Sequence, residues 1–280
     1  MNAVTKPTFD VERIRAEFPI LSQQVRGKPL VFLDSAASAQ KPRAVIDAMV
    51  QAMETQYANV HRGLHWMSER TTDAYEATRD AVARLLNAPS RDEVVFTKNT
   101  TEAINLVAYS YGRGILQPGQ AVVISAMEHH ANLVPWQMLR DSHGIELRVA
   151  PITDAGELDM AGLEDCLRDG KVGLVSVTHM SNVLGTVVPA ARVAALAHEY
   201  GARVMFDGSQ AVVHRAVDVQ AIGADFYTFT AHKLYGPTGI GVLYAKYDHL
   251  VAMRPYNGGG EMIREVAKDW VKYGDPPHKF

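Results

Sequence analysis

The sequence predicts an α/β fold with a mostly parallel sheet that is covered by helices on both faces. Two observations lead to this prediction. Short runs rich in β-branched residues are almost continuously apolar, which is typical of strands buried on both faces of a sheet. Segments with helical spacing of apolar residues separate these runs, and such alternation of strands and helices favours parallel pairing.

The expected elements follow one another along most of the chain. About seven strands are expected, at 93–98, 121–125, 146–151, 172–180, 203–208, 225–231 and 239–245. Helices are expected at 43–57, 68–87, 100–113, 132–143, 159–170 and 190–201. Residues 1–40 show little strand signal beyond LVFLD at 30–34, so we expect an arm or capping segment there. After GGGEM at 258–262 no further strand–helix pair is expected, and the final DPPHKF offers no apolar anchor.

Composition and charge exclude several classes of protein. The 280 residues are 47% apolar and 21% charged, with a formal net charge of −3, as in ordinary globular proteins. This charge favours neither a nucleic-acid partner nor an acidic membrane. One cysteine, Cys166, excludes an intrachain disulfide and is typical of a reducing compartment. No apolar stretch approaches the roughly 20 residues that span a bilayer, and no signal-peptide pattern is found, so we expect a cytoplasmic protein.

Polar residues follow several of the expected strands, at the edge where ligands of open α/β sheets bind. In KNTTEAINL, Thr100 or Thr101 is expected to cap a helix whose first turn offers N–H donors to a phosphate. Asp207 ends an apolar strand, where an unpaired carboxylate is costly and needs a cation or a donor. Each of these residues has a purely structural alternative as a helix cap.

Two further stretches carry imidazole and amide side chains. MEHHANLVPW places His129 and His130 behind a strand, as loop residues or as ligand contacts. Zinc coordination that also uses HRGLH at 61–65 is disfavoured, because Gly63 interrupts the expected helix, no cysteine is nearby and H-E-x-x-H is absent. In VTHMSNVLGT, Asn182 either donates to a ligand oxygen or serves the turn.

The stretch TFTAHKLYGPTGIG at 228–241 holds Lys233 between an apolar strand and a glycine-rich loop. An ammonium group is costly at a buried strand end, so the amine either reaches water or is needed for chemistry. The loop lacks both G-x-x-x-x-G-K-[ST] and G-x-G-x-x-G and leads into a strand, which disfavours a nucleotide site.

Together these groups match the requirements of pyridoxal 5′-phosphate. A lysine whose pKa is lowered by burial forms a Schiff base with the aldehyde. A carboxylate keeps the pyridine nitrogen protonated so that the ring accepts electrons, and imidazole offers a stacking face. Asp207 lies 26 residues before Lys233, about one strand–helix–strand unit.

Several long sequence motifs are specific enough to indicate a family. They are LDSAASAQKP (33–42), ANVHRGLH (58–65), MEHHANLVPWQM (127–138), THMSNVLGT (178–186), DGSQAVVHRAVDVQ (207–220), HKLYGPTGIG (232–241) and NGGGEMI (257–263). In the same order, over essentially the whole chain, they resemble the SUF-type (group II) cysteine desulfurases, which are fold-type I, class V aminotransferase-like enzymes.

The resemblance implies a role for each site residue. Lys233 would carry the cofactor and move protons, His129 would stack on the ring and help proton transfer, and Asp207 would hold the pyridine nitrogen. The other implied contacts are Gln210 to the phenolic oxygen, Thr100, Thr101, Thr230 and His232 to the phosphate, and Asn182, Ala37 and the nearby His61 at the substrate.

The implied reaction converts L-cysteine to L-alanine. A protein thiolate takes the sulfane sulfur and passes it to a sulfur-acceptor protein of the SUF system for Fe–S cluster assembly, and the implied assembly is a homodimer. The implied domains are an N-terminal arm or part of a small domain at 1–40, a pyridoxal-phosphate-binding large domain at 41–265, and the start of a truncated C-terminal region at 266–280.

One departure from the family pattern concerns the thiolate. The R-T-G-H-H-C-A type motif that carries it, and the family's carboxylate-binding arginine, do not occur in these 280 residues. Cys166, in LEDCLRDG, is no substitute by motif. We therefore expect cofactor binding at Lys233 but no persulfide from these residues alone. The alternatives are selenocysteine lyase activity, which needs less from a thiolate because selenium leaves more readily, or an inactive remnant that binds the cofactor or a partner.

Overall fold

The computed structural model describes residues 9–61 and 63–280. The first part of the expected arm, residues 1–8, and Arg62 of the HRGLH stretch lie outside the described residues. The chain forms two compact units. The smaller unit comprises Met1–Ala74 and His232–Pro237, and the larger comprises Tyr75–Ala231 and Thr238–Phe280.

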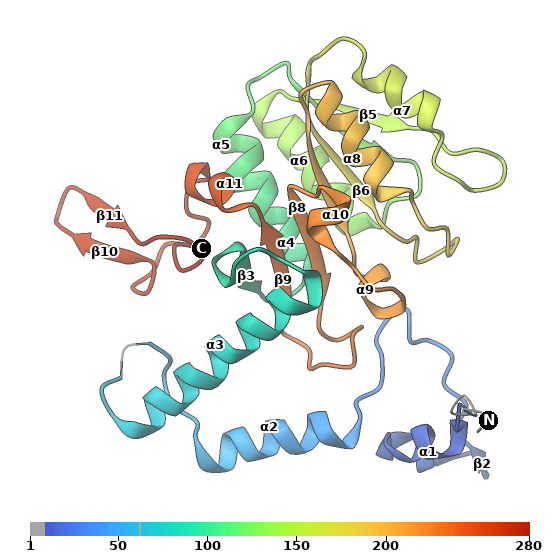
Figure 1. Cartoon of the computed structure of the whole chain (residues 1–280), viewed down its shortest axis with the longest axis vertical. Coiled ribbons are helices and arrows are strands. Elements are labelled where there is room, and N and C mark those ends of the chain that lie inside the picture. The colour runs from blue at the N-terminus through green and yellow to red at the C-terminus, as the bar shows by residue number, and fades with distance from the viewer. Residues whose placement is uncertain (1–8, 62) are drawn as a thin grey trace, which may run out of the picture. The chain divides into compact units, whose positions relative to one another are not determined.

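A seven-stranded sheet organises the larger unit, with the order β3-β9-β8-β7-β6-β4-β5 (Figure 1). Its strands are β3 (Val94–Thr97), β4 (Ala121–Ser125), β5 (Glu146–Ala150), β6 (Val172–Thr178), β7 (Arg203–Asp207), β8 (Phe226–Thr230) and β9 (Gly241–Ala245). The five strands from β5 to β8 in this order pair in parallel with their neighbours, and β9 runs antiparallel to both β8 and β3. The predicted fold class is confirmed, because each expected strand contains an observed one.

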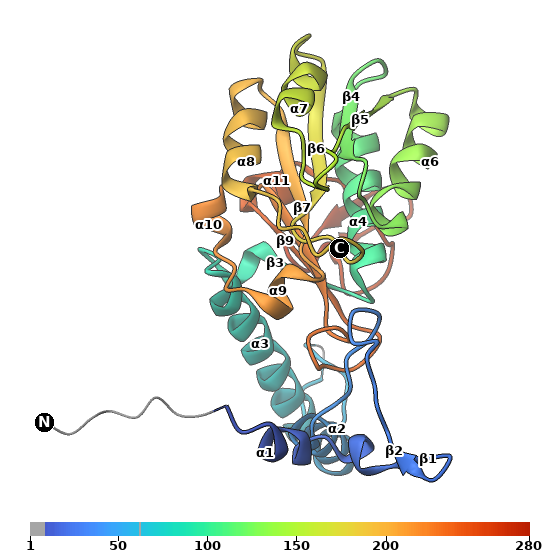
Figure 2. The ribbon, with the colours of Figure 1, turned by 90° about the vertical axis from the view of Figure 1, so that its right-hand side faces the viewer.

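Helices cover both faces of this sheet, as Figure 2 shows. On one face lie α4 (Thr100–Val107) and α6 (Val134–His143), and on the other lie α7 (Met160–Leu167), α8 (Ala190–Glu199) and α10 (Val219–Ile222). α4 packs on β8 and β9, and α8 packs on β7. The remaining short helices of this unit are η2 (Arg91–Glu93), η3 (Ala108–Gly112), α5 (Arg113–Ile115), η4 (His130–Asn132), α9 (Ala211–His214) and α11 (Tyr247–Ala252).

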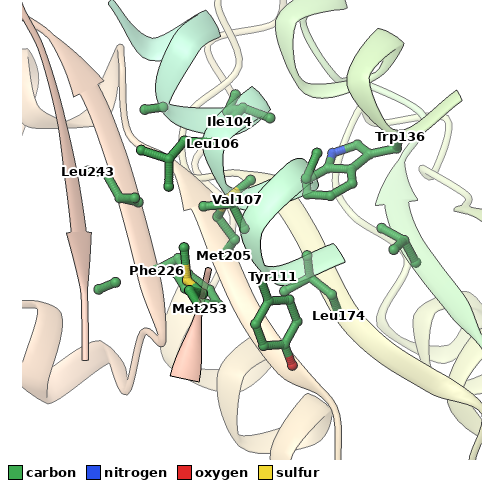
Figure 3. Close-up of a cluster of buried hydrophobic side chains, with 14 of the residues drawn as sticks. Ile104, Leu106, Val107, Tyr111, Trp136, Leu174, Met205, Phe226, Leu243 and Met253 are labelled. Atoms are coloured by element: carbon green, nitrogen blue, oxygen red, sulfur yellow. The ribbon is translucent and has the colours of Figure 1, made fainter. Parts of the chain in front are cut away.

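The main apolar core lies between α4, α6 and the sheet (Figure 3). Ile104 and Val107 project from α4, Trp136 from α6, and Phe226 and Leu243 from the strands, and all five have no exposed surface. Burial of each such side chain contributes about 1.5–3 kcal/mol. This layer fixes the start of α4 against the carboxyl end of the sheet.

The segment predicted as a helix at 100–113 is helical throughout, but most of its second half is π-helical. α4 ends at Val107, a π-helical turn covers Ala108–Gly112, and α5 follows. A Cβ at Gly112 would lie 2.5 Å from Cδ2 of Leu139 in α6. A larger residue fits here only if the Leu139 side chain moves, and a sequence pattern with helical period does not reveal such a contact.

The last residues form more structure than the sequence indicates. β10 (Ile263–Val266) and β11 (Val271–Tyr273) pair as an antiparallel hairpin that was not expected. Phe280 packs against the core, and Nζ of Lys279 donates to the carbonyls of Val251 and Met253 at 2.9 and 2.7 Å. The expectation that this segment lacks an apolar anchor is therefore wrong.

The smaller unit consists of short elements and two helices. They are α1 (Val11–Ala16), η1 (Pro19–Ser22), β1 (Gln24–Val25), β2 (Lys28–Pro29), α2 (Arg43–Thr55) and the beginning of α3 (Trp66–Leu86), which continues into the larger unit. The LVFLD stretch at 30–34 contains no strand. Among the described residues, no helix is long and apolar enough to span a membrane.

Candidate functional site

The carboxyl ends of β6, β7 and β8 collect polar residues in the larger unit. Thr178, Asp207 and Thr230 are the last residues of these strands, and Thr178 is the register partner of Asp207. All three side chains are buried. Because the strands are parallel, their carboxyl ends share one edge of the sheet, as a ligand site in an open α/β sheet requires.

The start of α4 borders this edge, but its cap differs from the prediction. Asn99, not Thr100 or Thr101, is the N-cap, and its Oδ1 accepts from the N–H of Glu102 at 2.8 Å. Its extended backbone suits a cap residue. Thr101 is exposed. The buried Thr100 hydroxyl lies 2.9 Å from that of Ser209, so two hydroxyl groups from separate elements meet beside the helix start.

A glycine permits the close approach of β9 to that helix start. A Cβ at Gly241 would lie 2.4 Å from the carbonyl carbon of Asn99. Part of the glycine-rich stretch after Lys233 is therefore needed for packing, because no larger residue fits between β9 and this turn.

Asp207 is the most confined carboxylate of this edge. It is 6% exposed, and its Oδ1 accepts from the N–H of Ser209 at 2.9 Å. Between them, a Cβ at Gly208 would lie 2.1 Å from the ring of Tyr227. Gln210, also buried, is the N-cap residue of α9. The DGSQ motif thus supplies, in four consecutive residues, a buried carboxylate acceptor, a glycine that the Tyr227 ring requires, a hydroxyl and an amide.

A histidine–tyrosine pair lies beside Asp207 and was not among the predicted site residues. The N–H of His179 donates to the carbonyl of Asp207 at 2.9 Å, and its Nδ1 lies 2.9 Å from the Tyr227 hydroxyl. Burial, with the Arg215 charge, lowers the pKa of His179 to about 4. Burial and the Asp207 charge raise the pKa of Tyr227. Both side chains are therefore neutral at pH 7.

Asn182 and His129 lie on turns that follow β6 and β4. In the first turn, the buried Ser181 hydroxyl accepts from the N–H groups of Val183 and Leu184, while Asn182 is exposed. The turn's hydrogen bonds therefore come from the serine and not from Asn182. In the second turn, His129 is the exposed N-cap of η4, and its Nδ1 accepts from the N–H of Ala131 at 3.1 Å.

The remaining predicted residues belong to the smaller unit. The His232 carbonyl accepts from the N–H of Ala39 and from Nζ of Lys41, both at 3.0 Å. Burial, with the charges of Lys233 and Lys41, lowers the pKa of His232. Lys233 itself is partly buried. It follows Thr230, the last residue of β8, by three residues along the chain.

Two predicted substrate contacts also lie in the smaller unit. Ala37 is exposed, and its N–H donates to the Asp34 carbonyl at 3.1 Å. His61 has a positive φ of 63°, and its N–H donates to Oγ1 of Thr72 at 2.8 Å. Non-glycine residues with positive φ are uncommon, so this backbone conformation marks His61 as a position worth testing.

Comparison with known proteins identifies relatives over almost the whole chain. Residues 31–280 match the family model described as aminotransferase class-V. A cysteine desulfurase from Dickeya dadantii is 58% identical over 273 residues, which are 97% of this chain and 66% of that protein. One from Pectobacterium atrosepticum is 52% identical over 274 residues, which are 98% of this chain and 67% of that protein.

Solved structures of cysteine desulfurases are also similar to this chain. The crystal structure of the cysteine desulfurase CsdA from Escherichia coli has a TM-score of 0.85 at 43% identity and covers 97% of this chain and 66% of that one. The apo structure of a cysteine desulfurase from Thermococcus onnurineus NA1 has a TM-score of 0.89 at 34% identity, with 100% and 67% covered. The chain thus spans 66 to 67% of the length of these relatives.

Proposed function

Because the chain belongs to the aminotransferase class-V family, we propose that the protein is a pyridoxal-phosphate-dependent cysteine desulfurase. It would convert L-cysteine to L-alanine and deliver sulfane sulfur to an acceptor protein. The observation that carries this proposal is the buried Asp207 carboxylate at the end of β7, beside the paired hydroxyls of Thr100 and Ser209. Relatives at 50 to 58% identity bear the same name.

The residues of the larger unit fit the cofactor by their chemistry. Its bound form supplies an aldehyde for an amine and a ring that accepts electrons. A buried carboxylate needs a cationic partner, which a protonated pyridine nitrogen at Asp207 would provide. The hydroxyls of Thr100 and Ser209 suit a phosphate, as does the first turn of α4. The further proposed contacts are Gln210 to the phenolic oxygen and Thr101, Thr230 and His232 to the phosphate.

Three side chains are proposed to act at the reacting atoms. Nζ of Lys233 would bond the cofactor and afterwards carry a proton to and from the substrate carbon. The imidazole of His129 would lie against the ring and assist proton transfer. Asn182 would orient the substrate amino acid, with Ala37 and His61 close to it.

The single cysteine is poorly suited to accept sulfur. Burial, with the charge of Asp165, raises the pKa of the Cys166 thiol. The nucleophile in sulfur transfer is the thiolate, so a raised pKa lowers its reactivity. We propose that the whole protein supplies the sulfur-accepting thiolate and passes sulfur to an acceptor of the SUF type. We also propose that it is a homodimer in the cytoplasm.

The cofactor site is tested with the 280-residue protein and pyridoxal phosphate. We expect a yellow absorption band that borohydride converts to an adduct, which peptide mass mapping locates on Lys233. The Lys233→Ala variant should give no adduct, whereas Lys171→Ala, a change outside the proposed site, should behave as wild type. A protein that stays colourless with added cofactor would contradict the proposal.

Two alternative functions are separated by their products. L-cysteine and L-selenocysteine are supplied in turn to the cofactor-loaded protein, and alanine is measured. Alanine from selenocysteine alone would favour a selenocysteine lyase. No alanine from either substrate would favour an inactive form that binds the cofactor or a partner.

A further inference from the structure

One carboxyl group, that of Glu128, connects the turn bearing His129 to two strands. Its Oε1 accepts from the N–H of Thr178, at the end of β6, at 2.9 Å and contacts the hydroxyl of Ser125, at the end of β4. Its Oε2 accepts from Nδ2 of Asn132, in η4, at 2.7 Å. The carboxyl group therefore joins both ends of the turn to the edge of the sheet that also carries Asp207.

The orientation of Asn132 is fixed by its other partners. Nε1 of Trp136 lies 3.0 Å from Oδ1 of Asn132 and the Ser176 hydroxyl lies 2.5 Å from it. An indole nitrogen can only donate, so Oδ1 must face the tryptophan and the NH₂ group must face Glu128. Asn132, Trp136 and Ser176 have no exposed surface, and turning the amide over would leave buried groups unpaired, which costs stability.

Only one of these contacts with Glu128 can change its direction. The N–H of Thr178 and the NH₂ of Asn132 can only donate, whereas the Ser125 hydroxyl can donate or accept. A proton bound to the carboxyl group therefore has its natural acceptor at Ser125, on the Oε1 side. The network defines which oxygen takes up and releases the proton.

The surroundings of Glu128 favour retention of that proton. The pKa of Glu128 is raised to about 7. Burial is the main cause and the negative charge of Asp207 adds to it, while the hydrogen bonds from Ser125, Asn132 and Thr178 act in the opposite direction. Of the other titratable groups, His129 and His130 follow Glu128 on the same turn, and His179 follows β6. Any cation that binds Asp207 would offset its charge and favour release of the proton.

We propose that Glu128 is a positioning residue for His129. We also propose that protonation of Glu128 at Oε1 is coupled to the charge at Asp207. Release of the proton breaks the Oε1–H bond, and the proton passes to solvent. The inference rests on the proposed function, in which His129 lies on the cofactor ring and Asp207 holds its nitrogen. Binding the cofactor would then convert Glu128 to the carboxylate, which accepts all three hydrogen bonds and fastens the turn.

The test uses NMR titration of the apo protein, with ¹³C-labelled glutamate and ¹⁵N-labelled histidine. We expect the Glu128 carboxyl carbon to titrate near pH 7. The His129 ring signals should show a step at that midpoint, beside any step that comes from protonation of the imidazole itself. In Ser125→Ala the midpoint of Glu128 and the matching step in the His129 signals should rise together, because the bond from Ser125 lowers the pKa of Glu128 and is lost in this variant. Adding pyridoxal phosphate should lower both.

Variants separate positioning from general support of the fold. Glutamine at position 128 faces donor-only groups on both sides, so Glu128→Gln should shift the His129 signals at every pH and abolish the common step. Glu164→Gln, which alters a carboxyl group bonded to Tyr200 at 3.0 Å, should leave them unchanged. If Glu128→Gln fails to fold, Ser125→Ala still decides, because it keeps the carboxyl group.

The contrary results are distinct from one another. Titration of Glu128 near the ordinary glutamate value, or His129 signals without a step at the midpoint of Glu128, would overturn the inference in the apo protein. Cofactor binding that leaves the midpoint of Glu128 unmoved would overturn the coupling to Asp207. A protein that binds no pyridoxal phosphate would refute the proposed function, and the apo titrations would still report on positioning.

Discussion

Nδ1 of His179 lies 2.9 Å from the hydroxyl of Tyr227, and each residue is more than nine-tenths buried. Because the imidazole is neutral, one ring nitrogen accepts and the other donates, and the Tyr227 hydroxyl can pair with Nδ1 in either role. The pair lies directly beside Asp207, so its loss is expected to disturb the edge that holds the proposed cofactor site.

Removing the Tyr227 hydroxyl should destabilise the protein. Tyr227→Phe leaves a buried imidazole nitrogen without its partner, and such a group costs about 1–3 kcal/mol. Urea unfolding followed by circular dichroism gives the difference in the free energy of unfolding. Tyr200→Phe removes a hydroxyl that donates to Glu164 on a partly exposed surface, and it should cost less. Equal losses would show that burial of the Tyr227 bond does not matter.

Two buried groups should oppose each other in the pH dependence of stability. Folding raises the pKa of Glu128 from 4.5 to about 7, so its contribution is full below pH 4.5 and is lost as the pH rises to 7. Folding lowers the pKa of His179 from 6.5 to about 4, so its contribution is present above pH 6.5 and is lost as the pH falls to 4. Between pH 4.5 and 6.5 the two slopes have opposite signs.

Replacing Glu128 should therefore reveal the contribution of His179 to the pH dependence of stability. In Glu128→Gln we expect the free energy of unfolding to rise with pH between about 4.5 and 6.5, by up to about 3 kcal/mol. In wild type the change contributed by these two groups should be smaller. Urea unfolding at a series of pH values measures both. A variant with the same pH profile as wild type would show that Glu128 does not titrate in this range.

A methyl group at position 208 should be poorly tolerated. In Gly208→Ala the new Cβ would lie 2.1 Å from the Tyr227 ring, a fully buried side chain in a strand that cannot move away cheaply. Overpacking of this kind costs about 1–3 kcal/mol. Gly258→Ala is the control, because nothing lies within 4 Å of the Cβ there. Thermal unfolding compares them, and a harmless Gly208→Ala would mean that β7 and β8 separate easily.

The buried Asp225 should matter far more for stability than exposed acids. Its carboxylate has no exposed surface and accepts from Lys246 at 2.8 Å and from Val204 at 2.9 Å, with His198 and His249 at 2.7 and 2.9 Å. These hydrogen bonds lower its pKa despite burial. Asp225→Asn would leave a buried group poorly paired, at a cost of about 3–5 kcal/mol.

The matched control for Asp225 is Asp169, whose carboxylate receives two bonds from Arg148 at the surface. Asp169→Asn should cost far less than Asp225→Asn, because exposed ion pairs are screened by water. Urea unfolding at pH 7 checks both variants. Since the pKa of Asp225 is lowered, wild type should also lose this contribution as the pH falls below the ordinary aspartate value. Equal costs for both variants would contradict the argument.

The sequence predicted the parts of this structure that depend on local patterns. Continuous apolar runs located every strand of the main sheet, and strand-end residues such as Asp207 and Thr230 followed from that placement. What it missed depends on neighbours distant in the chain. Asn99, not Thr100, is the cap, and the threonine hydroxyl instead lies beside that of Ser209, more than one hundred residues later.

Other missed features have the same origin. The polar contacts of Glu128 come from three separate elements, and its charge alone gives no sign of them. The anchoring of Phe280 depends on a core assembled from α4, α6 and the sheet. Partial signals were present, however, because Ser209 lies within the DGSQ motif and Glu128 directly precedes His129.

The strand order has a consequence for the sequence of events during synthesis. β3 is made before every other strand of the main sheet, yet it stands at an edge beside β9, the last of the seven to leave the ribosome. Domains fold as their chain emerges, and pairing of distant segments is slow. The earliest strand must therefore wait for its pairing partner until almost 150 further residues have been made. Newly made chains should be most dependent on chaperones in that interval.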